Sequence, residues 1–270
     1  MTTPTQPPSA PMPAPAPASF PAAADPSPGR ISTPGAIGAL YRLVLRHQLT
    51  RGRLVLFGVI LTICTILGWL IGRSNVTRVA DTVDVVSAFG LGLIVPVVAL
   101  VLGSAALGNW VEDETLVYVW LRPVARSRLA LAAVAAAATV AVPITVFSLG
   151  IMAALGSGGD ADALLGTVIG STLGSLAYVA VFVALGLLVK RALLWGLVYV
   201  FIWEFFIARA GDGAARLSIN SYASSLLADY SGQSIRLADR SLTASYIVLL
   251  AITWVALAFT TWRLQRANVA

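Results

Sequence analysis

Five long stretches of this sequence contain no charged residue, and each is long enough to cross a lipid bilayer. A helix rises ~1.5 Å per residue, so roughly 18 to 20 apolar residues cross the ~30 Å hydrocarbon core. Backbone in lipid must satisfy its own hydrogen bonds, so these stretches predict helices. A sixth stretch, 192–208, is interrupted only by Glu204. The sequence therefore predicts an all-α integral membrane protein with six transmembrane helices, the other five at 54–72, 85–111, 129–159, 163–189 and 241–262.

Composition supports this class and narrows the possible partners. Apolar residues make up 58% of the chain and charged residues only 11%, whereas soluble domains carry about 25% charged residues. The net charge is +6. In a membrane protein a basic surplus sets topology and attracts lipid headgroups, and the chain has no basic stripe of the kind that binds nucleic acid. We expect the lipid bilayer as a partner and no nucleic acid.

Three regions differ in character. Residues 1–35 hold 11 of the 14 prolines, and this Pro/Ala-rich tail is predicted to be disordered because it has too little apolar surface to bury. In residues 36–53 apolar side chains recur at helical spacing opposite basic ones, which predicts an amphipathic helix in the membrane interface. Residues 54–270 form the predicted six-helix domain.

The distribution of cations predicts the orientation of the chain. With the N-terminus in the cytoplasm, twelve Lys and Arg residues fall inside and six outside, as the positive-inside rule requires. We therefore predict a multi-pass protein of the plasma membrane with both termini cytoplasmic. Segment 112–128 is then cytoplasmic, and 209–244 is a long outer connection in which 217–227 is suited to a short or re-entrant helix.

Glu204 is the one ionisable residue well inside a predicted span. It follows Arg191 by 13 residues, which favours a position toward the outer half. A carboxylate there is costly and usually faces a cavity, a partner or the bundle interior. Three roles stay open: a structural hydrogen bond to another helix, a place on a translocation path or gate, and a proton-coupled site. Arg209 or Arg216 is a candidate ion-pair partner.

Other features of the spans concern packing. Gly166, Gly170 and Gly174 recur at steps of four, which lets another helix backbone come close. We favour a neighbour within the same chain over a dimer face. Pro96 and Pro143 are expected to kink their helices, because proline lacks the amide hydrogen and clashes with the preceding turn.

The sequence offers no set of residues for catalysis. No Gly-x-x-x-x-Gly-Lys-Ser/Thr loop, His-Glu-x-x-His pair or Gly-x-Ser-x-Gly elbow is present, and these motifs bind phosphate, bind zinc and carry nucleophiles respectively. Cys64 is the only cysteine and His47 the only histidine. We predict no catalytic residue, no metal site and no cofactor in this chain.

Segment 112–128 combines opposite charges in a fixed order. Three acids followed by a threonine precede an apolar stretch, Leu116–Leu121, and a proline and three arginines follow it. Acids before and cations after a short helix complement its dipole, and a proline ends such a helix. This order predicts a small structured element on the membrane surface, built from Glu112, Asp113, Glu114, Thr115, Arg122, Pro123, Arg126 and Arg128.

The same segment resembles the acidic-Thr-Leu…Arg-Pro-Val-x-Arg segment of ABC transporter permeases of the type-2 exporter family. The resemblance extends from about residue 36 over the plan of interfacial helix, six spans and long outer connection. Trp203-Glu204 and Leu217-Ser218-Ile219 also resemble a pattern of some actinobacterial members. Two departures are Glu114, where a glycine is usual, and Leu131-Ala132-Ala133, where a lysine is often found.

The resemblance implies a permease subunit that couples ATP hydrolysis to export of a substrate. Residues 112–128 would dock on a separate ATP-binding subunit, which would bind ATP and magnesium, and a second permease subunit would complete a homo- or heterodimer. Two alternatives remain: a proton-coupled secondary transporter using Glu204, and a non-transporting membrane scaffold. Substrate identity is not predicted.

Overall fold

The computed structural model describes residues 50–73, 78–112, 126–207, 212–235, 238 and 240–266, together with 38, 41–42, 44–46 and 48. Within these ranges the chain is helical and contains no strand. Unbroken apolar runs in which each backbone group bonds along its own chain account for this. The predicted all-α class is therefore confirmed for the described residues.

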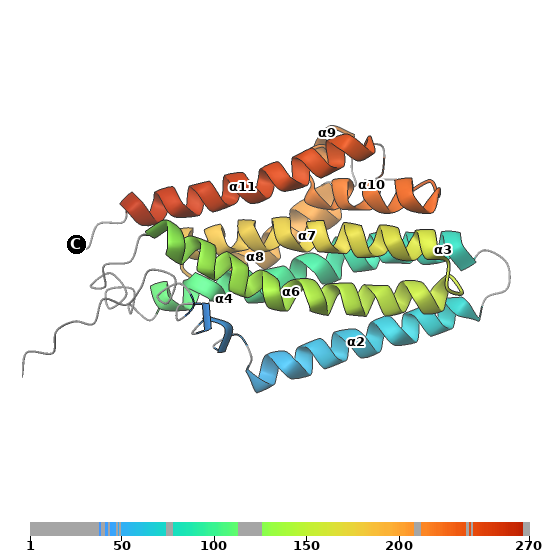
Figure 1. Ribbon diagram of the computed structural model, residues 1–270, viewed down its shortest axis with the longest axis horizontal. Coiled ribbons are helices and arrows are strands. Elements are labelled where there is room, and N and C mark those ends of the chain that lie inside the picture. The colour runs from blue at the N-terminus through green and yellow to red at the C-terminus, as the bar shows by residue number, and fades with distance from the viewer. Residues whose placement is uncertain are drawn as a thin grey trace, which may run out of the picture. The chain divides into compact units, whose positions relative to one another are not determined.

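Long apolar helices dominate the fold, as Figure 1 shows. Five of those in the described ranges are long and apolar enough to span a membrane, which matches the predicted class. One of the five is continuous over three segments, α3 (Arg78–Val85), η1 (Val86–Ile94) and α4 (Val95–Glu112). The other four are α2 (Arg51–Gly72), α6 (Arg126–Gly156), α7 (Ala161–Leu188) and α11 (Leu242–Arg266).

The sixth predicted span is a shorter helix. It consists of α8 (Ala192–Val198), with seven residues, followed by η2 (Tyr199–Ile207), with nine. At ~1.5 Å per residue a helix of this length covers at most about 24 Å of the ~30 Å core. The described residues thus contain five helices long enough to span a membrane and one short apolar helix, and the count of six spans stays a prediction.

Two stretches are wound as π-helix rather than α-helix, which the sequence did not predict. In η1 the amide of Val95 donates to the carbonyl of Gly90, five residues back. This widened turn ends one residue before Pro96, whose ring clashes with the carbonyl four residues earlier in a regular α-helix. The π-helical winding is a local adjustment at the position where we expected a kink. Pro143 lies inside α6, which continues through it.

Local sequence explains both turns that flank α7. Before it, Gly158 and Gly159 adopt positive φ angles of 73° and 87°, a region that glycine enters without steric cost. Asp160 then caps the helix by accepting a hydrogen bond from the Ala163 amide at 2.8 Å. After it, Arg191 has φ 64° and reverses the chain into α8.

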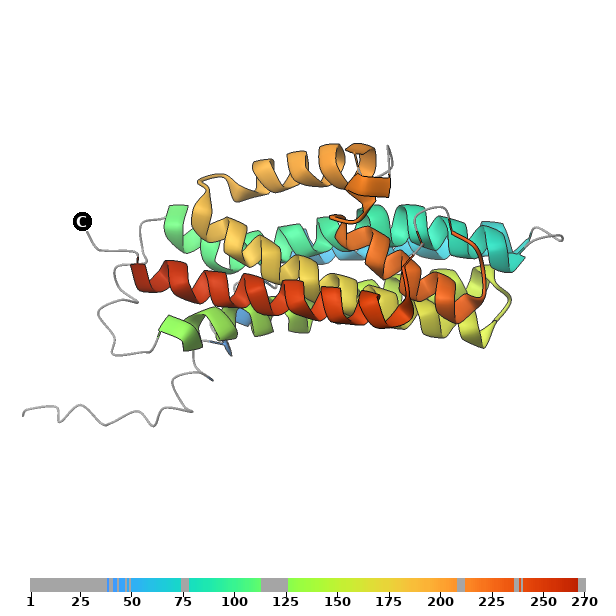
Figure 2. The ribbon, with the colours of Figure 1, turned by 90° about the horizontal axis from the view of Figure 1, so that it is seen from above.

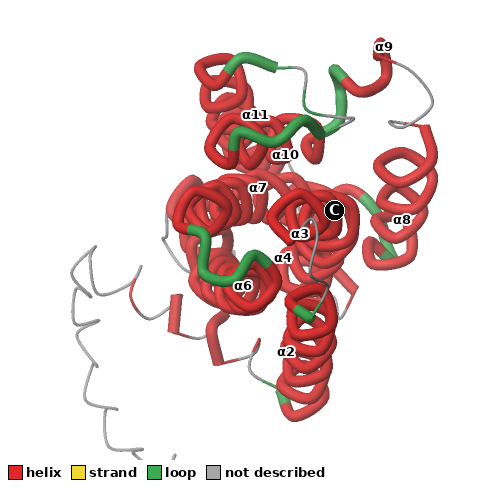
Figure 3. Tube along the Cα trace, turned by 90° about the vertical axis from the view of Figure 1, so that its right-hand side faces the viewer, coloured by secondary structure: helices red, strands yellow, loops and turns green. Residues whose placement is uncertain are grey.

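Helix α7 lies at the centre of the bundle. It packs against α4, α6, α11 and the short helix α10 (Ile219–Ser231), and α2 packs mainly on α6. Figure 3, viewed along the helices, shows α7 enclosed by these neighbours and α2 beyond α6 and α4. In an apolar 18-residue stretch of α2, and in one of α11, only 17% is buried inside the bundle. Apolar helices exposed in this way are consistent with a membrane-embedded protein.

The glycine stripe of α7 faces α10, as expected for packing within one chain. A Cβ placed on Gly170 would lie 2.9 Å from the carbonyl oxygen of Ala223, and one on Gly166 would lie 3.0 Å from that of Leu227. Only residues without a side chain allow the two backbones this approach. The prediction of an intrachain neighbour is confirmed.

Helix α9 (Asp212–Ala215) is a single turn that precedes α10 in the chain.

The N-terminal predictions are covered only in part. The tail 1–35 lies outside the described residues, and within 36–53 the described positions before Thr50 are helical. There Val44 is buried while Arg42 and Arg46 are exposed, and the Tyr41 hydroxyl donates to Thr139 Oγ1 of α6 at 3.1 Å. The amphipathic interfacial helix stays a prediction.

Candidate functional site

The charged segment 112–128 is described only at its two borders. Glu112 is the last residue of α4 and Arg126 the first of α6, and Arg128 is half-buried on the first turn of α6. The ends of α4 and α6 lie at the same end of the bundle in Figure 1, here called the α4–α6 end. The remaining predicted coupling residues, Asp113, Glu114, Thr115, Arg122 and Pro123, lie outside the described residues.

Glu204 lies in the interior and is the centre of a polar cluster. Its side chain is 1% exposed. One carboxylate oxygen, Oε2, accepts a hydrogen bond from Ser218 Oγ at 2.5 Å. The other, Oε1, accepts from the Ile219 amide and from the Tyr199 hydroxyl, both at 3.2 Å. A buried carboxylate is costly unless such donors surround it, and here three neutral donors do.

Two of these donors belong to the start of α10. Ser218 is its N-cap and Ile219 its first residue, and Ser218 Oγ also accepts from the Ser221 amide at 3.2 Å. The first amides of a helix lack partners within it, and the helix dipole places partial positive charge there. Glu204 therefore fills the anion position at the N-terminus of α10 and joins that helix to η2.

The position of Glu204 along the bundle differs from the sequence expectation. Its carboxylate adjoins the Tyr178 hydroxyl, which makes no hydrogen bond of normal geometry. Tyr178 is ten residues from the end of α7 and 17 from its start. At ~1.5 Å per residue these are about 15 Å and about 26 Å, so Glu204 is nearer the α4–α6 end.

The expected arginine partners of Glu204 are not seen in the described part of the chain. Arg216 is exposed and makes none of the hydrogen bonds to the carboxylate described above. Arg209 lies outside the described residues. Sequence reasoning did not identify Ser218, Ile219 and Tyr199 as partners of Glu204, although serine is a residue type favoured at a helix N-cap.

Polar contacts continue from Glu204 toward the end of the bundle opposite the α4–α6 end. Ser87 Oγ of η1 donates to Ser224 Oγ of α10 at 2.9 Å, and Ser224 Oγ donates to Asn220 Oδ1 at 3.2 Å. In α6 and α7, Thr145 and Ser175 share a hydrogen bond of 2.8 Å. All five of these side chains are 2% exposed or less. The interior around α10 thus contains small polar side chains that form hydrogen bonds with one another.

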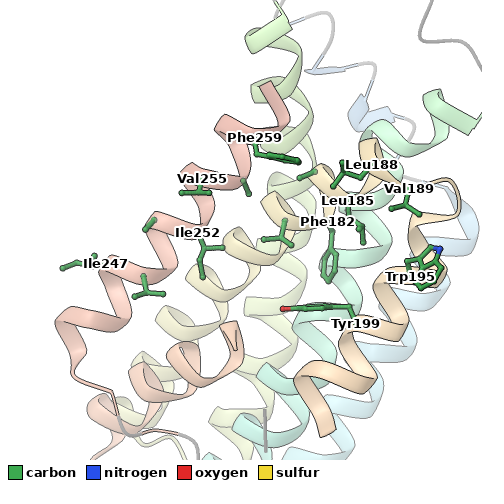
Figure 4. Close-up of a pocket in the computed structure, with 15 residues that line it drawn as sticks. Phe182, Leu185, Leu188, Val189, Trp195, Tyr199, Ile247, Ile252, Val255 and Phe259 are labelled. Carbon is green, nitrogen blue, oxygen red and sulfur yellow. The ribbon is translucent and has the colours of Figure 1, made fainter. Parts of the chain in front are cut away.

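An apolar groove lies on the other side of Tyr199. Its volume is about 960 Å³, and its walls come from α7, from α8 and η2, and from α11. Figure 2 shows α8 and η2 set apart from α11, with α7 between them, and Figure 4 shows Phe182 and Tyr199 on the groove floor. The rings of Phe182 and Tyr199 meet edge to face at 6.2 Å, and Phe182 stacks on Tyr178 at 5.9 Å.

This aromatic layer separates two chemical environments. Tyr199 lines the groove with its ring and donates its hydroxyl to Glu204. Fully buried Phe182 stands beside it. The groove therefore offers a ligand apolar surface, while the carboxylate behind the rings already has its donors. No group of three or more His, Cys, Asp or Glu residues suited to a metal ion occurs among the described residues.

Comparisons with known proteins add no identity. No family model matches the chain, and no curated protein matches it. A functional assignment therefore has to rest on the residues and helices themselves.

Proposed function

We propose that this chain is the membrane-spanning permease subunit of an ATP-driven exporter of the ABC type, with six spans in the plasma membrane. The observation that carries the proposal is the ordered charged segment 112–128, which connects two of the long apolar helices, α4 and α6. Such a segment suits a docking surface, because acids and arginines at opposite ends of a short helix present both charges to a partner.

The packing of α4 and α6 supports transmission of force from that segment. Both helices contact α7, which in turn contacts α10 and α11. The α4–α7 contact is close: a Cβ on Gly186 would lie 2.8 Å from the carbonyl oxygen of Ser104. Packed interiors deform little and move as units. A push on segment 112–128 would therefore move α7 and the helices attached to it.

We assign ATP binding and membrane transport to different subunits because this sequence lacks an ATP-binding motif. With no phosphate-binding loop in the sequence, ATP and magnesium are assigned to a separate ATP-binding subunit, and this chain carries no catalytic residue. Six spans per subunit call for a second permease subunit, identical or related. In this proposal the α4–α6 end faces the cytoplasm, because the predicted topology assigns twelve of the eighteen cations to that side. Both termini are then cytoplasmic.

The decisive test is co-purification of this chain with an ATP-binding protein. We expect Arg122, Arg126 and Arg128 changed to Glu, or Glu112, Asp113 and Glu114 changed to Lys, to weaken the association at least about tenfold, since three reversed charges make favourable contacts repulsive. The matched control reverses Arg73 and Arg216, exposed cations away from this segment.

Three outcomes separate the candidates. Loss of the complex in the segment variants but not in the control supports coupling through 112–128. An unchanged complex with unchanged ATP hydrolysis in both segment variants contradicts it. A stable complex whose ATP hydrolysis responds to no substrate indicates a scaffold instead.

A second candidate function rests on Glu204. A carboxylate buried near the middle of a membrane bundle is a common feature of proton-coupled transporters. Against it, the described surroundings of Glu204 supply hydroxyl groups and one amide as donors and no second carboxylate or histidine. Transport driven by a pH gradient without any ATP-binding partner, and abolished by Glu204→Gln, would favour this candidate over the exporter.

A further inference from the structure

The apolar groove continues into a basic rim at the α4–α6 end. On α11 the groove-lining residues Val255 and Phe259 are one helical turn apart, and Arg263 follows after one more turn. Residues at this spacing share a helix face, so Arg263 extends the lining stripe, and Arg266 follows it three residues later. Arg266 lies over the Trp262 ring, with its guanidinium carbon 4.4 Å from the ring centroid.

The opposite wall contributes a cation at the same end. Val189 lines the groove where α7 stops, and Lys190 follows it directly. Lys190, Arg263 and Arg266 are all exposed; we call them the basic rim. Helix α11 contains no acidic residue, and the one acid of α8 and η2, Glu204, is buried behind the aromatic layer. Lys190, Arg263 and Arg266 therefore place positive charge on two walls at the mouth of an apolar groove.

We propose that this groove binds an anionic phospholipid, with one acyl chain along the groove and the phosphate at the basic rim. The proposal requires only that the chain spans a bilayer and does not depend on the exporter assignment or on which end is cytoplasmic. Basic pockets between transmembrane helices recognise lipid headgroups through charge. The groove is lined almost wholly by aliphatic and aromatic side chains from three helices, which matches an acyl chain.

The dimensions fit one leaflet of a bilayer. Ile247 and Phe259 line the two ends of the α11 wall, as Figure 4 shows. They are twelve residues apart, which is about 18 Å along a helix. Half of the ~30 Å hydrocarbon core is about 15 Å. A lipid whose phosphate lies at the rim would therefore end its chain near Tyr199 and Ile247, close to the bilayer centre.

The test uses the full-length chain purified in detergent and titrated with dioleoyl phosphatidylglycerol or dioleoyl phosphatidylcholine, with bound lipid counted by native mass spectrometry. The rim variant is Lys190→Gln, Arg263→Gln and Arg266→Gln combined. The groove variant is Ala251→Trp, which fills the groove from an exposed lining position. The control, Arg73→Gln with Arg216→Gln, removes exposed arginines elsewhere, including one stacked on Trp69 at 3.9 Å.

The proposal predicts tighter binding of phosphatidylglycerol than of phosphatidylcholine. The rim variant should lose this preference by at least about tenfold, since each cation near an anionic surface contributes on the order of a fivefold gain. It should still bind phosphatidylcholine, and the control should behave as the unaltered chain. Ala251→Trp should abolish high-affinity binding of both lipids. If it fails to elute as folded protein, Ile247→Trp at the far end of the groove takes its place.

Two results would overturn the proposal. One is equal binding of both lipids by the unaltered chain and the rim variant, which would mean an adventitious annular lipid only. The other is a lipid-free dimer that Ala251→Trp splits into monomers, because the groove would then be occupied by a second copy of this chain.

Discussion

The two halves of α7 carry different side chains and meet their neighbours differently. In the half away from the α4–α6 end, Gly166, Gly170 and Gly174 bring the backbone of α10 within contact distance. In the half toward the α4–α6 end, Leu185 and Leu188 line the open groove with other large apolar residues. Small residues of α7 accompany close packing, also in this half at Gly186 against α4, and large apolar residues line the groove.

The contrast extends to polarity. Where α10 packs closely, serines and threonines find partners within the protein, as Ser87 and Ser224 do at 2.9 Å. Where the groove lies, the described lining contains no hydroxyl group except that of Tyr199. Glu204 and the aromatic layer of Phe182 and Tyr199 mark the boundary between the halves. Helices that approach closely therefore also share hydrogen bonds. Polar groups in a lipid environment need partners, and only a neighbouring helix can provide them.

The largest expected effect comes from disrupting the half of α7 that packs closely against α10. Gly170→Leu would place side-chain atoms where the Ala223 carbonyl lies, 2.9 Å from an ideal Cβ, and would force α10 away from α7. We expect a loss of stability near the upper end of the about 1–3 kcal/mol typical of overpacking, measured as the midpoint of thermal unfolding in detergent. The control Gly58→Leu meets no atom within 4 Å and should leave the midpoint unchanged. Equal effects of both changes would contradict the close packing.

An intermediate effect is expected at the boundary. Glu204→Ala removes the acceptor for Ser218 Oγ and the Ile219 amide, and a buried donor without a partner costs about 1–3 kcal/mol. Glu204→Gln should cost less, because its amide oxygen still accepts. Thermal unfolding and protease cleavage of the 208–218 connection would report both. Exposed Asp162 on α7 gives the control, Asp162→Ala. A Glu204→Ala protein as stable as the control would show that the carboxylate does not hold α10.

The smallest effect is expected in the groove. Leu185→Ala removes a half-buried side chain whose surroundings are open to lipid, so acyl chains replace the lost contacts and the change should stay below about 1 kcal/mol. Leu227→Ala, the same change at a fully buried position of α10, should cost several times more in the same unfolding experiment. A larger loss at Leu185 than at Leu227 would reverse the distinction between the halves.

Sequence reasoning predicted the helices well because hydropathy acts on each stretch by itself. Stretches such as 54–72 and 163–189 recur as α2 and α7 within a few residues, since a long apolar run in lipid has few alternatives to a helix. The stretch 192–208 was harder. Its composition resembles that of a span, but the described helix is shorter than a span, and its start is set by the left-handed turn at Arg191.

The candidate site was predicted less completely. The glycines of α7 indicated that some backbone comes close, and they could not indicate α10, because small residues carry no information about their neighbour. Glu204 was recognised by its charge, which suggested arginine partners. Its donors are a serine and a backbone amide 14 and 15 residues later, and only the three-dimensional fold brings these groups to it. The coupling residues 113–125 stay a prediction from charge order.

The short helix α8–η2 also bears on how the chain enters the membrane during synthesis. Its sixteen residues are fewer than a typical span, and Glu204 lies within them. An acidic side chain inside an apolar helix opposes insertion when the helix enters the membrane alone. The donors that offset this cost, Ser218 and Ile219, leave the ribosome later than Glu204 does. This segment is therefore expected to settle only after α10 has been made, so that the last third of the chain is inserted as one cooperative unit.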